Sequence, residues 1–232
     1  MKADRAFEAV VFDLFGTLIE NLSHSGYRDV LTRMAIELDA CPDDFIKAWS
    51  STINLRMTGQ FGSMENNVRC VCEKIGVSTT DAQLSAAAEI RLGYTRQCFV
   101  PRDDAISTLQ TLKGLGFKTG LVTDCTAEVP FLWPHTLFLP LFDATVFSCL
   151  IGTTKPDPIM YQTISERLGV EPDKCIYIGD GSSQELTGAR QIGMRALLIT
   201  GPQLDLANVD RSDFAQWDGE KISALSEVLT II

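Results

Sequence analysis

Six side chains of the kinds that carry out nucleophilic and metal-assisted chemistry follow apolar runs of the sequence. They are Asp13, Thr123, Asp124, Lys155, Asp180 and Glu185. A carboxylate is ionised at neutral pH and can attack an electrophile without first losing a proton. Hydroxyl and ammonium groups can stabilise the charge that then develops, and further carboxylates are hard ligands for Mg²⁺. Each residue alone has an ordinary structural explanation: an aspartate can cap a turn or helix, Thr123 can be a strand-end hydroxyl, and Lys155 can be a solvated loop charge. The functional interpretation therefore depends on their joint placement.

Short apolar runs, rich in β-branched residues, immediately precede or lead toward these side chains and are typical of buried strands. The expected strands are Ala9–Phe12, Lys118–Val122, Ala144–Phe147, Cys175–Ile178 and Arg195–Ile199. Helical patterns separate them, one ending before Gly116 and another before Gly169. Strands that alternate with helices predict an α/β fold with a parallel sheet, which binds ligands beyond the carboxyl ends of its strands. The polar side chains all fall at that edge.

The stretch from about residue 22 to residue 99 interrupts this alternation with helical patterns and no clear strand. We expect helices over Asp43–Met57, Glu65–Ile75 and Asp81–Phe99. This predicts a core of residues 1–21 and 100–232, with a helical insertion over residues 22–99. A further segment, Val129–Leu141, contains three prolines and is expected to be a loop whose aromatic side chains pack on the core or the insertion.

Composition narrows the class of protein and of partner. The formal net charge of −10 and the pI of about 4.7 argue against a nucleic-acid-binding protein, which would concentrate Lys and Arg on one face. No apolar run approaches the roughly 18 residues of a membrane span. The seven scattered cysteines favour a reducing compartment, so we expect a cytoplasmic protein. We expect its partner to be a small-molecule substrate. The sequence does not determine the oligomeric state.

Four segments together resemble the four motifs of the haloacid dehalogenase superfamily. They are VFDLFGTL at Val11–Leu18, LVTDC around Thr123, TKPDP around Lys155, and IGDGSSQELTGARQIGM around Asp180. The match spans the predicted core, and the helical insertion falls where that family has its cap domain. The resemblance implies a hydrolase with a Rossmann-like parallel sheet core and an inserted helical cap.

The resemblance also implies a role for each site residue. Asp13 would be the nucleophile, and Thr123 and Lys155 would stabilise the charge on the transferring group. Mg²⁺ would be held by Asp13, the backbone carbonyl of Phe15, Asp180 and Glu185. Glu185 stands where the family more often has Asp, so its longer side chain could reach the metal through water. The residues expected beside this site, with a supporting role, are Gly16, Thr17, Asp124 and Ser182.

One residue departs from the phosphatase pattern of the family, in which a second aspartate two positions after the nucleophile acts as a general acid. Phe15 occupies that position, as an aromatic residue does in 2-haloacid dehalogenases, where halide leaves without a proton. The Gly179–Gly181 segment instead resembles a retained Mg²⁺ site. The preferred hypothesis is a Mg²⁺-dependent phosphatase acting on a small, anionic phosphorylated metabolite. The alternatives are a metal-independent 2-haloacid dehalogenase and a weakly active binding relative.

Overall fold

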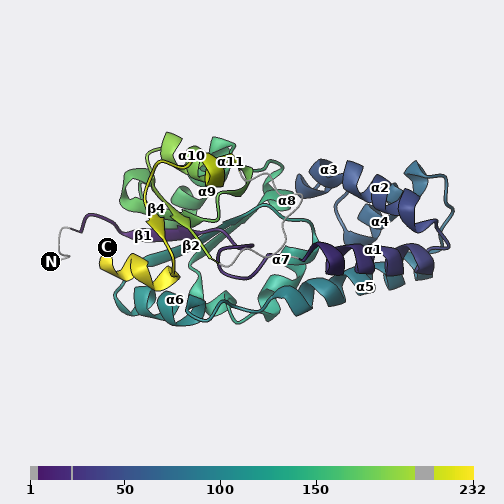
Figure 1. Ribbon diagram of the computed structural model, residues 1–232, viewed down its shortest axis with the longest axis horizontal. Coiled ribbons are helices and arrows are strands. Elements are labelled where there is room, and N and C mark those ends of the chain that lie inside the picture. Colours follow the sequence, from purple (N-terminus) through teal and green to yellow (C-terminus); the bar gives the residue numbers. More distant parts are fainter. Residues whose placement is uncertain (1–4, 22, 202–211) are drawn as a thin grey trace.

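The computed structural model describes residues 5–21, 23–201 and 212–232, and a six-stranded parallel sheet lies at its centre (Figure 1). Its strands are β1 (Ala9–Phe12), β2 (Lys118–Thr123), β3 (Ala144–Phe147), β4 (Cys175–Gly179), β5 (Arg195–Ile199) and β6 (Lys221–Ile222). They are arranged in the order β3-β2-β1-β4-β5-β6, and all neighbours are parallel. The α/β parallel sheet and its first five strands are confirmed. Because β6 has only two residues, it offers no apolar run that the sequence analysis could detect.

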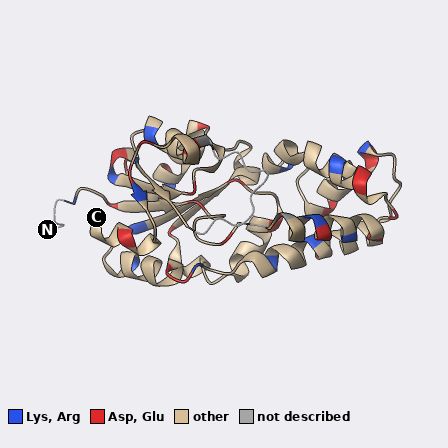
Figure 2. Ribbon diagram, viewed as in Figure 1, with Lys and Arg blue, Asp and Glu red and all other residues tan. Residues whose placement is uncertain are grey.

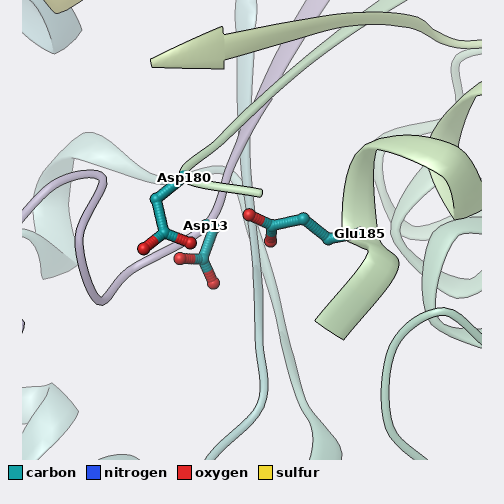
Figure 3. Close-up of side chains that lie close together, drawn as sticks. All are labelled: Asp13, Asp180 and Glu185. Carbon is teal, nitrogen blue, oxygen red and sulfur yellow. The ribbon is translucent and has the colours of Figure 1, made fainter. Parts of the chain in front are cut away.

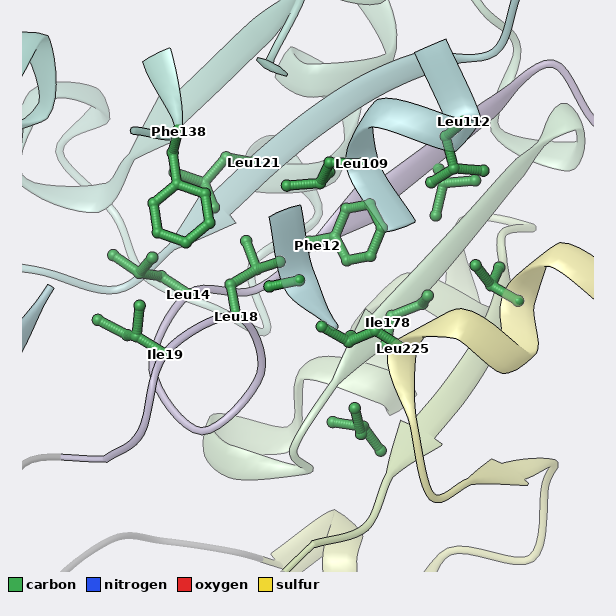
Figure 4. Close-up of a cluster of buried hydrophobic side chains, with 14 of the residues drawn as sticks. Phe12, Leu14, Leu18, Ile19, Leu109, Leu112, Leu121, Phe138, Ile178 and Leu225 are labelled. Carbon is green, nitrogen blue, oxygen red and sulfur yellow. The ribbon is translucent and has the colours of Figure 1, made fainter. Parts of the chain in front are cut away.

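Helices cover both faces of the sheet, because alternate residues of a strand point to opposite sides. On one face lie α6 (Ala105–Gly114) and the C-terminal 3₁₀ helix η5 (Leu225–Thr230). On the other lie α9 (Pro158–Leu168), α10 (Glu185–Gln191) and α11 (Ser212–Gln216) (Figure 1). Val10 and Phe12 of β1 pack with α6, whereas Ala9 and Val11 pack with α9. Figure 4 shows Phe12 at the centre of the first of these clusters, among Leu109, Leu112 and Leu225.

Five helices follow β1 and form a separate unit beside the sheet (Figure 1). They are α1 (His24–Glu37), α2 (Pro42–Ser51), α3 (Ile53–Met57), α4 (Met64–Lys74) and α5 (Asp81–Cys98). Their apolar side chains form their own hydrophobic core, which includes Phe45, Trp49 and Leu84. A separate core is what an inserted domain requires, so we propose the boundaries 22–99 for a cap and 1–21 with 100–232 for the remaining core.

Two details of the helical unit differ from the expectation. The predicted helix over Asp43–Met57 is in fact α2 and α3, because the Thr52 hydroxyl donates to the carbonyls of Ala48 and Trp49 and so competes with the helical hydrogen bonds. The sequence analysis also missed α1 altogether. Ser23 caps α1 by accepting a hydrogen bond from the Gly26 backbone N–H, a start signal that was available in the sequence.

The segment Val129–Leu141 is not the loop that its prolines suggested. It contains most of α7 (Glu128–Leu132) and two 3₁₀ helices, η1 (Trp133–His135) and η2 (Leu139–Leu141). Each proline falls within the first turn of its helix, where the missing N–H is not needed. Trp133 and Phe138 are buried and stacked as expected, whereas Phe131 is 61% exposed.

Three further short elements complete the core: the helix α8 (Ser148–Ile151) and the 3₁₀ helices η3 (Pro172–Lys174) and η4 (Ser182–Gln184).

Charged residues of both signs are interspersed along the ribbon, in the sheet region as well as in the helical unit (Figure 2). The net charge of −10 is therefore distributed over the chain. Among the described residues, none of the helices is both long enough and apolar enough to cross a membrane.

Candidate active site

The central strand β1 delivers Asp13 to the carboxyl edge of the sheet. β1 lies between β2 and β4, so the residues that follow these three strands meet at one edge. Asp13 is only 4% exposed, and its backbone N–H continues the sheet by donating to the carbonyl of Ile178. Its two carboxylate oxygens have different partners. Oδ1 accepts from Lys155 Nζ at 2.6 Å, and Oδ2 accepts a long hydrogen bond from the Thr17 hydroxyl at 3.3 Å. We infer that Oδ2 is the better placed of the two for attack.

Lys155 links two of the three carboxylates. Its ammonium donates to Asp13 Oδ1 and to Glu185 Oε2, each at 2.6 Å, and the side chain is buried. The backbone N–H of Lys155 donates to Asp124 Oδ1 at 3.0 Å, which ties the loop after β3 to the loop after β2. Lys155 is thus fixed from both its backbone and its side chain.

Asp180 follows β4 and places its carboxylate beside that of Asp13 (Figure 3). Oδ1 accepts from the backbone N–H and the hydroxyl of Ser182, at 3.0 and 2.6 Å. Oδ2 accepts from the Asn21 side-chain amide at 3.1 Å. These donors hold the carboxylate in one orientation, and the contact with Asn21 connects it to the loop after β1.

Glu185 begins α10 and points back toward the other two carboxylates (Figure 3). It is fully buried, and Tyr177 and the Gly181 backbone N–H donate to its carboxylate at 2.8 and 3.0 Å. With Lys155 as a third donor, both of its oxygens have partners. A side chain held in this way is suited to fixing the lysine and to contacting a metal through water.

Three further predicted residues lie beside these groups, at a strand end or in the loop after β1. Thr123, at the end of β2, is fully buried, and its hydroxyl makes no hydrogen bond to any described residue. Gly16 has φ of +78°, and a Cβ there would lie 2.3 Å from Asp180 Oδ2, so the turn and the close approach both require glycine. Phe15 is half-buried and packs its ring against the main hydrophobic core.

Burial and charge together perturb the titration of this cluster. Burial, helped by the neighbouring Asp180 and opposed by Lys155, raises the pKa of Asp13 to about 6. Burial also raises the pKa of Glu185 well above its ordinary range, against the opposing effect of Lys155. For Lys155, burial lowers the pKa, but Asp13, Glu185 and Asp124 more than compensate and raise it well above its ordinary value. Lys155 therefore remains an ammonium at neutral pH.

The chemistry of the donor set fits a divalent cation. One oxygen each of Asp13, Asp180 and Glu185 lies within 4.8 Å of the others, and carboxylate oxygens are the hard ligands that Mg²⁺ prefers. Three carboxylates against one ammonium leave a formal charge of −2 in a buried cluster, which is costly without a counter-ion. A divalent cation would neutralise that charge.

Sequence reasoning missed three residues that shape this site. Tyr177 donates to the Glu185 side chain, and Tyr161 donates to the Glu185 backbone carbonyl at 2.9 Å. Both tyrosines lie in apolar runs and look like ordinary core residues in the sequence. Asn21, which orients Asp180, lies at the boundary of the insertion, where no motif marks it.

The comparisons with known proteins agree with this geometry. A family model described as haloacid dehalogenase-like hydrolase matches residues 7–193. The chain therefore belongs to the haloacid dehalogenase-like hydrolase family and is a hydrolase. It is 26% identical to a glyceraldehyde 3-phosphate phosphatase of Methanopyrus kandleri, over 96% of this chain and 97% of that protein. It is 24% identical to a phosphoglycolate phosphatase of Shigella boydii, over 87% and 86% of the two chains.

A solved structure shares the fold at lower sequence identity. The 2-haloacid dehalogenase of Pseudomonas syringae pv. Tomato superposes with a TM-score of 0.71 at 22% identity, covering 97% of each chain. This likeness shows the architecture of the chain and leaves the reaction to be argued from the site.

Proposed function

We propose that this protein is a Mg²⁺-dependent phosphatase that transfers a phosphoryl group from a small phosphorylated metabolite to Asp13 and then to water. The observation that carries the proposal is the buried cluster of Asp13, Asp180 and Glu185 around Lys155 at the carboxyl edge of the sheet. A cluster with a formal charge of −2 suits a cation and a phosphate group together. It suits a metal-independent reaction less well.

Different residues of the chain would act in the two steps of the reaction. In the first step, Asp13 Oδ2 would form a bond to phosphorus while the bond between phosphorus and the leaving-group oxygen breaks. Lys155 holds Asp13 Oδ1, which leaves Oδ2 to attack. The Thr123 hydroxyl, which has no partner among the described residues, is available to donate to a phosphoryl oxygen. In the second step, water would attack the phosphorus of the phosphoaspartate and release Asp13 and inorganic phosphate.

The proposed metal ligands are Asp13, Asp180 and the backbone carbonyl of Phe15, with Glu185 contacting the metal through water. When bound, Mg²⁺ would neutralise the negative charge of both the nucleophile and the substrate. Lys155 and Tyr177 both donate to Glu185 Oε2, whereas Oε1 accepts from the Gly181 N–H alone, so Oε1 is the oxygen that would face the metal-bound water.

Phe15 limits the leaving groups that this site can use. It cannot donate a proton, and a missing general acid costs about 10² to 10⁴ in rate when the leaving group is a poor one. We propose that the preferred substrates have leaving groups that depart unprotonated, as acyl phosphates and phosphoanhydrides do. Asp124, fixed by the Lys155 backbone N–H, is the proposed base for the attacking water, since burial raises its pKa.

The comparisons support the phosphatase hypothesis over its alternatives. The two relatives described above that match along most of the chain are named as phosphatases of small metabolites. Phe15 is the observation that favours the second candidate, a 2-haloacid dehalogenase, and a weakly active binding relative is the third. We also infer a cytoplasmic location and a small anionic substrate, because all seven cysteines are free thiols and the charge of the chain opposes binding to nucleic acid.

A substrate panel with and without a chelator tests the proposal. It should contain acyl phosphates, p-nitrophenyl phosphate, alkyl phosphates and L-2-chloropropionate. We expect turnover of the first two with Mg²⁺ and none with chelator, and less than about 1% of that turnover for Asp13→Asn, which conserves shape and removes the nucleophile. Turnover of L-2-chloropropionate that persists with chelator would replace this proposal with the dehalogenase.

A further inference from the structure

A buried arginine on helix α3 has hydrogen-bond donors that nothing in the described chain uses. Arg56 is 1% exposed, and its guanidinium stacks on the Trp49 ring at 3.8 Å and donates through Nη2 to the Trp49 carbonyl at 2.9 Å. Its Nε and Nη1 make no hydrogen bond to any described residue. A buried donor left without an acceptor costs about 1–3 kcal/mol, and more when it is charged.

A second buried arginine, on helix α5, lies in the same cluster. Arg91 donates through Nη2 to Glu128 Oε1 at 2.7 Å, and both side chains are at most 5% exposed. Its Nε and Nη1 are also without partners among the described residues, and so is the hydroxyl of Thr95, one turn further along the same face of α5. Burial lowers the pKa of Arg56 to about 10, while Glu128 raises it and Arg91 lowers it, so these three groups interact.

The cluster lies where the helical unit meets the sheet. Glu128 begins α7 and comes five residues after Thr123, so it lies at most about 18 Å from that site residue. On the other side, Gly59 follows α3 so closely against the core that a Cβ there would lie 1.9 Å from the Cys149 carbonyl oxygen in α8. α7 and α8 follow β2 and β3, so both contacts lie at the carboxyl edge that carries the active site (Figure 1).

The formal charges in this cluster do not balance. Arg56 and Arg91 bring two positive charges and Glu128 brings one negative charge, all of them buried. Both Glu128 oxygens already have a donor, because Arg91 donates to one and Thr126 donates to the other. An unpaired buried guanidinium is costly, and a bidentate contact with a carboxylate or phosphate is the interaction its geometry favours.

We propose that Arg56, supported by Arg91, recognises a second anionic group of the substrate, a carboxylate or a phosphate, while the phosphoryl group to be hydrolysed lies at Asp13. The inference rests on the proposed phosphatase function and adds the class of its substrate: a small phosphate compound that is anionic at both ends. Two observations support the inference. Arg56 and Arg91 together have four guanidinium nitrogens without a partner among the described residues, and their cluster has a net positive charge in an otherwise acidic protein.

Two matched phosphonates test this without turnover, because a carbon–phosphorus bond resists a phosphatase. The probes are 3-phosphonopropionate, which is anionic at both ends, and 3-hydroxypropylphosphonate, whose far end is neutral. Isothermal titration calorimetry with the wild-type chain and Mg²⁺ should show at least about tenfold tighter binding of the first probe, the size expected for a charge-assisted contact. Arg56→Gln should remove this preference and leave the affinity for the neutral probe unchanged.

Two further variants make the result specific to Arg56. Arg69→Gln is the matched control, because Arg69 lies on α4 in an exposed pair with Asp81, and it should retain the preference. Arg56→Lys keeps the charge and the apolar stem, and so covers the case in which Arg56→Gln fails to fold by circular dichroism. It should lose severalfold of the preference, since an ammonium cannot make the bidentate contact.

The possible results separate the inference about Arg56 from the proposed phosphatase function. Equal affinities of the wild-type chain for the two probes, or a preference that survives in both Arg56 variants, would overturn the inference and leave the phosphatase proposal standing. If neither phosphonate binds in the presence of Mg²⁺, the phosphate site at Asp13 is itself wrong, and the proposed function fails together with the inference.

Discussion

The ion pair between Arg91 and Glu128 offers a sharp test of how the helical unit is held against the sheet. We predict that Glu128→Gln destabilises the protein strongly, because it leaves two buried guanidinium groups without a counter-ion. Removing one partner of a buried pair costs about 3–5 kcal/mol. In a protein of this size, each kcal/mol lowers the melting temperature by about 2–4 °C, so the expected fall is about 6–20 °C.

The assay is thermal unfolding followed by circular dichroism at pH 7. Asp43→Asn is the matched control, because Asp43 pairs with Arg28 at 3.0 Å and both side chains are more than half exposed. An exposed pair contributes at most about 1 kcal/mol, so the control should lose less than about 4 °C. Adding Arg91→Met to Glu128→Gln should recover part of the loss by removing one unpaired charge.

The pH dependence of the same pair has a definite sign. Burial raises the pKa of Glu128, but Arg91 and Thr126 outweigh it and hold the pKa below the ordinary value of 4.5. The pair therefore stabilises the fold above that pH and stops doing so as the pH falls through the pKa of the folded state. The difference in melting temperature between wild type and Glu128→Gln should shrink below pH 4.5. A fall at pH 7 no larger than that of Asp43→Asn would refute the argument.

Three substitutions in the active site give further expected outcomes. Asp180→Asn should raise the Mg²⁺ concentration needed for half-maximal rate at least about tenfold, since it removes an anionic ligand; a Mg²⁺ titration that matches wild type would exclude Asp180 from the metal site. Phe15→Asp should increase the rate on alkyl phosphates relative to p-nitrophenyl phosphate, by up to about 10² to 10⁴. Unchanged relative rates would make Phe15 a packing residue. Gly16→Ala would place a Cβ 2.3 Å from Asp180 Oδ2 at φ of +78°, and should reduce turnover more than tenfold while costing about 1–3 kcal/mol of stability in urea unfolding. Full activity would contradict the close approach.

The sequence determined the architecture of the core and the position of the site within it. Five apolar runs alternate with helices, and a helix that carries the chain back across the sheet makes successive strands parallel. Asp13, Lys155 and Asp180 could be placed at one edge because each follows a strand or the loop beyond it. Local patterns of this kind depend only on residues that are close in the sequence, so they can be recognised before the fold is known.

The tertiary structure decided how the polar groups are paired. The sequence shows three carboxylates and a lysine, but only the fold determines that Lys155 bridges Asp13 and Glu185. Only the fold, too, determines that Tyr177 and Gly181 donate to the Glu185 carboxylate. Burial, which no local pattern reports, raises the pKa of Asp13 to about 6.

In the helical unit, too, the sequence does not reveal which charged side chains are buried together. Arg56 and Arg91 read in the sequence as ordinary helix residues, which long charged side chains usually are when exposed. Their burial, their unused donors and their contact with the sheet through Glu128 arise only when α3 and α5 pack against α8 and α7. Residues 35 positions apart then share one site, because side chains distant in sequence become neighbours only through packing. The sequence determined which chemistry the chain carries, and the fold decided which charges meet.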